Sequence, residues 1–479
     1  MKKLMLSVLA AFLLVFANAD MAFAAEGENI GSELSLIFVI PFVCMLLCIA
    51  IFPLVAGEFW EKNRHWFVIL WSLLFLIPFA VKYGMGNMTE QLLESVIGDY
   101  LTFIVLLFGL FCVAGNISLQ GDLVGSPKVN IILLLIGTAL ASWIGTTGAS
   151  MVLIRPLIRA NKWRNRKVHI IVFFIFLVSN IGGCLTPVGD PPLLMGFTRG
   201  VGFFWSTSHL LPMLLVNVVI LLVVFYFMDS RAYKKDIEDG LKPELSDDKA
   251  PLKLVGAHNI FFLVCIVGAV VLYGILNNSF GHEWGIHLYG EVYLTFSAII
   301  ECVIILLAAL LSFKTTKKEV RTANHFTWAA IEEVAVLFIG IFITMIPALL
   351  ILKAKGPELG LTEPWQMFWS TGLLSSFLDN TPTYLVFFTT ASTLGATAGV
   401  SVLNGSAFIA TTMLQAISCG AVFMGANTYI GNAPNFMVKA IAEENGIKMP
   451  SFFGYMAWSC SILVPTFIVD MFIFFNPFA

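Results

Sequence analysis

Residues 178–197 constrain the fold of this chain most, because they interrupt an apolar run that would otherwise suit a transmembrane helix. Pro187, Pro191 and Pro192 remove backbone donors and clash with the preceding turn, so the helix cannot continue through them. Hydrocarbon does not tolerate unpaired backbone groups, so a broken helix must lie inside protein or line a watery cavity. Asp190 adds a carboxyl group to this break. A carboxylate at a broken transmembrane helix is typical of a transporter site.

A second segment, residues 427–437, has the same order of residue types. A further pair of similar stretches, 138–148 and 371–382, precedes the two breaks. Two motifs that recur in the same order predict two structurally related halves. The matched residues at the breaks are Thr186 and Thr428, Gly189 and Gly431, Asp190 and Asn432, and Pro192 and Pro434.

The composition places the chain in a lipid bilayer. Of its 479 residues, 58% are hydrophobic and 12% charged, whereas about a quarter are charged in soluble proteins. The net charge of −3 argues against a nucleic acid as partner. The eight cysteines stand singly in or beside apolar stretches, which favours small buried hydrophobic residues over disulfides or metal ligands.

Residues 1–24 have the features of a secretory signal peptide. A basic start, Met1-Lys2-Lys3, precedes the short apolar core 4–16 and the small-residue cleavage site Ala22-Phe23-Ala24. An uncleaved anchor is the alternative. Export by a bacterial route predicts location in the bacterial inner membrane with an external mature N-terminus.

Apolar runs of roughly 17–25 residues predict a first transmembrane repeat at 30–228 and a second at 259–479. The polar segment 229–258 between them is predicted to be a cytoplasmic linker. The most basic loop, 159–167, also belongs in the cytoplasm by the positive-inside rule.

That loop can be cytoplasmic only if the preceding stretch 129–158 enters and leaves on one side, as a re-entrant hairpin with its tip at 145–148. The matching hairpin, 365–394, is predicted to enter from outside. Each half then has about five spans and one hairpin, and an odd number of spans inverts the second half. The expected fold is an all-α polytopic membrane protein of two inverted-topology repeats, each with one broken helix, and with an external C-terminus.

Three motifs carry a family resemblance: Ser-Asn-Ile-Gly-Gly to Asp-Pro-Pro at 179–192, Ser-Phe-Leu-Asp-Asn-Thr-Pro at 376–382 and Ile-Gly-Asn-Ala-Pro-Asn at 430–435. They resemble the ion-transporter superfamily, which includes NhaD-type sodium/proton antiporters, the citrate/proton symporter family, arsenite-efflux permeases and the melanosomal P-protein. The chain is particularly similar to a branch whose members carry both the name citrate transporter and the name sodium/proton antiporter. The resemblance covers the chain from the first span to the C-terminus, and it implies a secondary transporter without selecting the cargo.

The predicted site contains one motif carboxylate from each half, Asp190 and Asp379. The repeat is broken here, since Asn432 matches Asp190 and Thr146 matches Asp379. Oxygen ligands suit Na⁺, and a carboxylate can bind a proton instead, so one site could exchange the two ions. The alternative is that these polar residues cap the half-helices at the breaks. The predicted metal ligands are Asp190 and Asp379, and the further ion- or substrate-binding residues are Asn180, Thr186, Ser376, Asn380, Asn427, Thr428 and Asn432.

Three functions are weighed on this basis. The leading hypothesis is a Na⁺/H⁺ antiporter, with Li⁺ as a further cargo, no enzymatic activity and no resident cofactor. The alternative is cation-coupled transport of citrate or a dicarboxylate, with helix N-termini at Pro191 and Pro434 holding the anion. A remote third is an intramembrane aspartyl protease, which 187–190 disfavours because it is not Gly-x-Gly-Asp. A homodimer is left open.

Three other acidic residues lie in the predicted spans. Glu332 and Glu333 lie near the predicted cytoplasmic end of their span, where solvation at the interface explains them. Asp470 lies inside the last span with no partner recognisable in the sequence. A packing contact and a functional role are both open for it.

Overall fold

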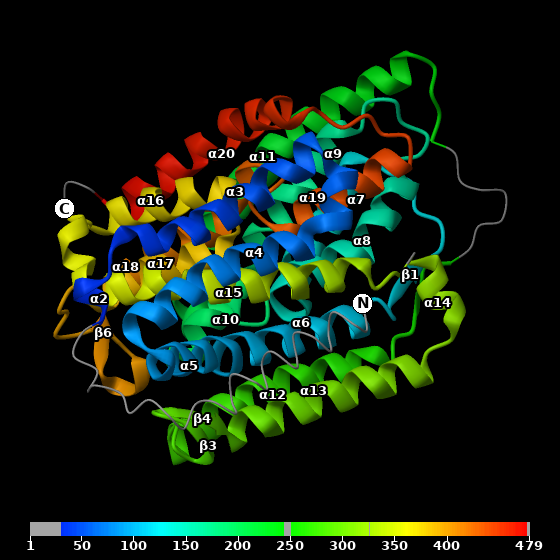
Figure 1. The fold of residues 1–479 in the computed structure, drawn as a ribbon. Coiled ribbons are helices and arrows are strands. Elements are labelled where there is room, and N and C mark those ends of the chain that lie inside the picture. The colour runs from blue at the N-terminus through cyan, green and yellow to red at the C-terminus, as the bar shows by residue number, and fades with distance from the viewer. Residues whose placement is uncertain (1–29, 244–250, 325, 477–479) are drawn as a thin grey trace.

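The computed structural model describes residues 30–243, 251–324 and 326–476. The predicted signal peptide, residues 1–24, lies outside the described residues. Long helices run along a common direction, as an all-α membrane protein requires (Figure 1). Ten helices in the described part are long and apolar enough to cross a membrane. The chain is therefore a polytopic all-α membrane protein.

The first spans form an antiparallel group at the N-terminal end of the chain. Helix α4 packs on α3, and α15 from the second half packs on both. The third span is interrupted by a π-helical segment, whose wider turn is often associated with function. The elements are α2 (Ile30–Glu33), η2 (Leu36–Val39), α3 (Ile40–Val55), α4 (Gly57–Tyr83), α5 (Met85–Leu93), η3 (Glu94–Tyr100), α6 (Leu101–Ala114) and β1 (Ser118–Gln120).

The predicted first hairpin consists of α7 (Pro127–Ile144) and α8 (Thr146–Ala160). The chain reverses at Gly145, whose φ of 78° is accessible to glycine at little cost. The two ends meet again at the base, where the N–H of Gly125 donates to the carbonyl oxygen of Ala160 (2.7 Å). The chain thus returns to the end of the molecule from which it came.

The first broken helix follows the hairpin as α9 (Val168–Leu177), η4 (Ile181–Leu185) and α10 (Pro191–Thr198). Pro191 takes the first helical position of α10, where its missing N–H costs nothing. Of the 18-residue window starting at Val168, 89% is buried, so this segment is enclosed by protein rather than lipid. The break therefore lies inside the molecule, as its sequence requires.

The predicted linker 229–258 contains regular structure in its described parts. Helix α11 (Trp205–Glu238) continues through its first part, because Asp229 and Asp236 are buried there in ion pairs. Further on, β2 (Lys253–Val255) pairs antiparallel with β1. The segment is thus anchored to the first half at both described ends.

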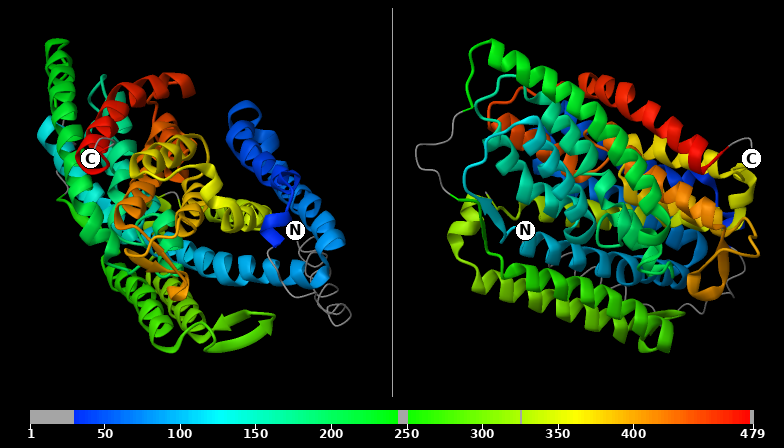
Figure 2. Two further views of the ribbon diagram at one scale, coloured as in Figure 1. Left: turned by 90° about the vertical axis from the view of Figure 1, so that its left-hand side faces the viewer. Right: turned by 180° about the vertical axis from the view of Figure 1, so that it is seen from behind.

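The second half begins with a helix pair, α12 (Asn259–Phe280) and α13 (Phe296–Thr315), which packs against α6 along one flank (Figure 2). The strands β3 (Gly285–Tyr289) and β4 (Val292–Thr295) form the hairpin that joins them. The short α14 (Lys318–Ala323) leads to α15 (Ala329–Lys355) and η5 (Gly356–Leu359).

The second hairpin, α16 (Pro364–Phe377) and α17 (Asn380–Ser392), lies at the opposite end of the molecule from the first (Figure 1). It precedes the second broken helix, which packs between its arms. The opposed hairpins agree with inverted repeats, while the orientation of each half in the membrane stays a prediction. The remaining elements are β5 (Val400–Val402), η6 (Leu403–Gly405), β6 (Ala407–Ile409), α18 (Thr411–Met424), η7 (Gly425–Asn427), α19 (Ala433–Glu444) and α20 (Phe452–Phe474).

Candidate functional site

Asp190 lies where the two hairpin tips meet the two broken helices. Its side chain is buried. Oδ1 accepts hydrogen bonds from the hydroxyl of Thr146 (3.1 Å) and the amide of Asn432 (3.2 Å). Oδ2 accepts one from the amide of Asn380 (2.6 Å). The three donors come from the first hairpin, the second broken helix and the second hairpin, so one carboxylate joins four segments.

These donors stabilise a negative charge on Asp190. A buried carboxylate without partners costs several kcal/mol, and each hydrogen bond to a charged group returns about 1.5–3 kcal/mol. Asp190 and Asn432 are also the N-cap residues of α10 and α19. The positive ends of two helix dipoles therefore face the same point. A cation bound here would meet a charged oxygen ligand.

Asparagine side chains hold the two broken helices together. The amide nitrogen of Asn180 donates to Oδ1 of Asn435 (2.7 Å). Asn432 donates to the carbonyl oxygen of Ser179 (3.1 Å) as well as to Asp190. The breaks in the two halves are thus in direct contact. From the sequence, this contact could be expected only because the two halves repeat the same motifs.

Thr186 and Thr428 have the same structural role in the two halves. The hydroxyl of Thr186 donates to the carbonyl oxygen of Ser142, and that of Thr428 donates to the carbonyl oxygen of Ser376. Each hydroxyl also accepts from the backbone N–H two residues further on (3.2 Å in both). These bonds fasten each unwound segment to its own hairpin. Both hydroxyls thus stabilise the broken helices.

Asp379 interacts electrostatically with Asp190 but makes a different set of hydrogen bonds. Its Oδ1 accepts a hydrogen bond from the N–H of Thr381 (3.0 Å), which caps α17. Among the described residues, no hydrogen bond links Asp379 to Asp190. The second hairpin instead reaches Asp190 through the neighbouring residue, Asn380.

Two predicted ligands have oxygen atoms that could hold a cation. Asn427 donates to the hydroxyl of Ser376 (2.9 Å), and Asn180 donates to two acceptors. The amide orientations follow from these bonds. Oδ1 of both asparagines is buried with no hydrogen-bond partner in the described structure. Unpartnered carbonyl-type oxygens are ligands that hard cations prefer.

The sequence reasoning missed Ser142 and Asn435. A signal existed for both, because Ser142 matches Ser375 in the repeated upstream stretch and Asn435 closes the motif at 430–435. The hydroxyl of Ser142 accepts from the N–H of Leu185 (3.0 Å) and its carbonyl oxygen holds Thr186. Backbone carbonyl contacts of this kind do not depend on side-chain type, so residue patterns reveal them poorly.

A second buried polar cluster lies at the base of the first hairpin. Arg164 has a fully buried side chain that forms ion pairs with Asp229 and Asp236 (3.2 Å) of α11. His169, at the start of α9, shares a hydrogen bond with Asp229 (2.8 Å). In the adjoining loop, Arg166 donates hydrogen bonds to Asp239 and Asp236, and these bonds raise the pKa of its guanidinium. This cluster fixes the hairpin base and α9 to α11.

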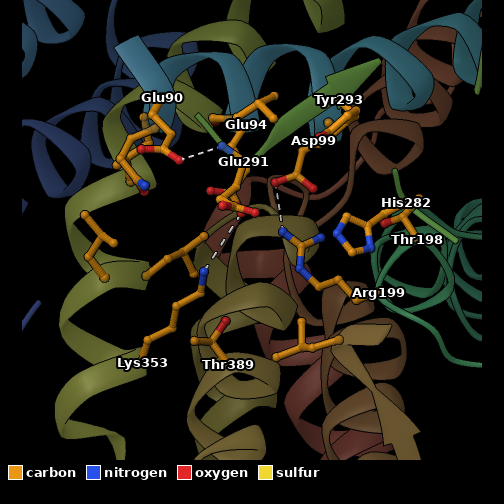
Figure 3. A pocket seen from close by; sticks show the side chains of 18 of the residues that line it. Glu90, Glu94, Asp99, Thr198, Arg199, His282, Glu291, Tyr293, Lys353 and Thr389 are labelled. Atoms are coloured by element: carbon orange, nitrogen blue, oxygen red, sulfur yellow. Dashed lines mark hydrogen bonds and ion pairs between the residues drawn. The ribbon is translucent and has the colours of Figure 1, made fainter. Parts of the chain in front are cut away.

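A polar cavity of about 340 Å³ lies at the C-terminal end of α10, whose N-terminus carries Asp190 (Figure 3). Arg199, the C-cap residue of α10, points into it and pairs with Asp99 of the π-helical segment η3 (2.8 Å). Lys353 reaches Glu94 from the opposite wall (4.0 Å). The cavity therefore connects polar side chains to the half-helix that bears the central carboxylate. Its acidic side chains are Glu90, Glu94, Asp99 and Glu291.

In the part of the chain that the structure describes, no group of three or more His, Cys, Asp or Glu side chains could hold a metal ion. The central site is thus built from one carboxylate with amides and hydroxyls.

Comparison with protein families supports a transport function for this arrangement. Residues 31–475 match a family described as "Putative citrate transport". Comparison with curated proteins gave no match. The matched range includes both hairpins, both broken helices and every residue of the central site. The chain belongs to this citrate transport family and is a membrane transporter.

Proposed function

We propose that this protein is a cation-coupled transporter of citrate or a related carboxylate, and that Asp190 binds the coupling cation. The observation that carries the proposal is the position of Asp190, a buried carboxylate between the N-termini of two half-helices. A carboxylate attracts a cation, while helix N-termini attract an anion. The family description supports a carboxylate as cargo.

The two ligands would bind in a fixed order. A free organic anion is repelled by ionised Asp190, so the cation binds first and removes that repulsion. The positive ends of the α10 and α19 helix dipoles can then attract the carboxylate. Pro191 and Pro192 carry no N–H, so α10 contributes its dipole rather than its first N–H groups. This dependence of one ligand on the other is the physical basis of coupling.

Na⁺/H⁺ antiport, with Li⁺ as a further cargo, is the second candidate. One observation favours it: among the described residues, none of the hydrogen bonds and ion pairs at Asp190 involves a lysine or arginine side chain. Such a site suits a small cation without an accompanying anion. Asp190 would then bind Na⁺ and H⁺ alternately.

Purified protein in proteoliposomes separates the two candidates. We expect labelled citrate to accumulate only when an inward Na⁺ or H⁺ gradient is imposed, with one of the two ions supporting uptake. A panel of di- and tricarboxylates as competitors would then define the cargo. Na⁺-driven proton release in vesicles that contain no organic acid, together with no citrate uptake, would replace this proposal by the antiporter.

A further inference from the structure

Asp470 forms a second buried carboxylate site, on a helix that packs outside the two breaks. It lies in α20 and is only 1% exposed. Its partner is Asn217 of α11, which is fully buried. The amide nitrogen of Asn217 donates to Oδ2 of Asp470 (2.7 Å) and to the carbonyl oxygen of Met213 (2.8 Å).

The second of these bonds fixes the orientation of the amide. If the Asn217 amide were flipped, its oxygen would face the Met213 carbonyl oxygen, and two acceptors would meet. Oδ1 of Asn217 therefore points elsewhere, and it has no hydrogen-bond partner in the described structure. Oδ1 of Asp470 is also buried and also lacks a partner there. The pair thus holds two acceptor oxygens and no donor for either.

Asp190 and Asp229, which are also buried, have more hydrogen-bond donors or charged partners than Asp470. Asp190 receives three hydrogen bonds from side-chain donors, and Asp229 is paired with Arg164 and bonded to His169 and Asn130. Asp470 accepts one hydrogen bond, from a neutral amide, and forms no ion pair with any described residue. An ionised carboxylate at such a position costs several kcal/mol. The described surroundings of Asp470 therefore do little to stabilise a negative charge on it.

We propose that Asp470 is a proton-binding site and carries its proton as a neutral carboxylic acid in this conformation. The proton sits on the oxygen that lacks a donor, and it leaves to water as H⁺ when the carboxylate forms. A metal cation fits less well, because hard cations take about six or more oxygen ligands and the pair offers two unpartnered ones. Within the described residues, the titratable group that faces it is the thiol of Cys419 on α18, which interacts electrostatically with Asp470. The neighbouring α16 contributes Trp369, which does not titrate.

The two helices of this site are each bonded to one break. In α11, the hydroxyl of Thr207 donates to the carbonyl oxygen of Leu185 in η4 (2.6 Å). In α20, the hydroxyl of Ser459 donates to the carbonyl oxygen of Asn427 in η7 (2.6 Å). A charge that appears on Asp470 therefore weakens packing between the helices that hold the two breaks. Release of the proton from Asp470 thereby changes how the helices around the central site pack, a step that rests on the proposed function.

Infrared spectroscopy of the purified full-length protein tests the protonation state directly. The wild type is expected to show the carbonyl band of a protonated carboxyl that Asp470→Asn loses, while the control Glu332→Gln, at an exposed carboxyl, retains it. Asp470→Leu is a second neutral variant, and the measurement needs only one of the two to fold. Retention of the band in a folded neutral variant overturns the proposal.

Stability against pH provides an independent measurement. If the folded state holds a proton that the unfolded carboxyl releases, the folded state binds about one more proton, so stability falls as pH rises. Asp470→Asn should remove this part of the pH dependence. An unchanged slope overturns the proposal.

Neither measurement uses a substrate. One outcome is that the variants lose the infrared band and the pH dependence of stability while the wild type takes up no citrate. That combination would support the proton site and contradict only the proposed function. If uptake is confirmed, Asp470→Asn is expected to retain citrate exchange and lose most of the pH dependence of net uptake. Asp190→Asn is expected to weaken cation-driven uptake itself.

Discussion

At the level of single residues, Asp190 and Asp379 carry the same functional group in different surroundings. Asp190 accepts from three side chains of three segments, whereas Asp379 accepts from the backbone of its own helix. Asparagine is as good a helix cap as aspartate, but it cannot replace an acceptor that is surrounded by donors. The two residues should therefore respond differently to the same substitution.

We expect Asp190→Asn to weaken apparent affinity for the coupling cation at least tenfold in proteoliposome uptake. The lost charge-assisted contact is worth roughly 1.5–3 kcal/mol, and 1.4 kcal/mol is about a factor of ten. Asp379→Asn should weaken this affinity less, because the acceptor for the Thr381 N–H is kept and only a longer-range interaction with Asp190 is lost. An equal loss in both variants would favour the shared two-carboxylate site that the sequence suggested.

The residue types of the site were predictable and their roles were not. Proline and glycine at the breaks identified where backbone groups are freed, and this led to Asp190, Asn180 and Asn432. The geometry that separates a cation ligand from a helix cap depends on contacts between segments far apart in the chain. Thr186 and Thr428 show this, since their hydroxyls fasten the breaks to the hairpins.

At the level of elements, the first hairpin depends on a buried ion-pair cluster at its base. Arg164→Ala removes the buried ion-pair partner of Asp229 and one of the two arginine partners of Asp236. Breaking such a buried pair costs about 3–5 kcal/mol. We expect a large fall in the thermal unfolding midpoint of the purified protein. Arg166→Ala is the matched control, because the Arg166 side chain is 42% exposed and its loss leaves Arg164 in place. Similar midpoints for both variants would show that the buried pairs do not stabilise the hairpin.

The sequence predicted these elements well where a physical signal was local. The hairpin was inferred from the position of basic residues, and Gly145 marked its tip. The continuation of α11 to Glu238 was missed because a charged, polar stretch looks like a loop when its ion-pair partners are unknown. The ion-pair partners of this stretch are Arg164 and Arg166, which lie far upstream in the chain. Arg164, for example, precedes Asp229 by 65 residues.

At the level of the whole molecule, the opposed hairpins place two similar loops at opposite ends. Asn165, in the loop after the first hairpin, and Thr397, in the loop after the second, are both exposed. Single cysteines at these positions should react with an impermeant maleimide from opposite sides of the membrane, with Asn165 on the cytoplasmic side. The exposed Cys460 is first replaced by serine. Labelling of both positions from one side would exclude inverted repeats.

The enclosure of the first break also has a consequence for how the protein is made. Two of the donors to Asp190 lie far downstream, Asn380 by 190 residues and Asn432 by 242. While the chain is being synthesised, the first half must therefore enter the bilayer with its carboxylate still lacking them. Until the second hairpin and the second broken helix have been inserted, this half lacks two of the three side-chain donors to its carboxylate. The central site can then be completed only when the last quarter of the chain has left the ribosome.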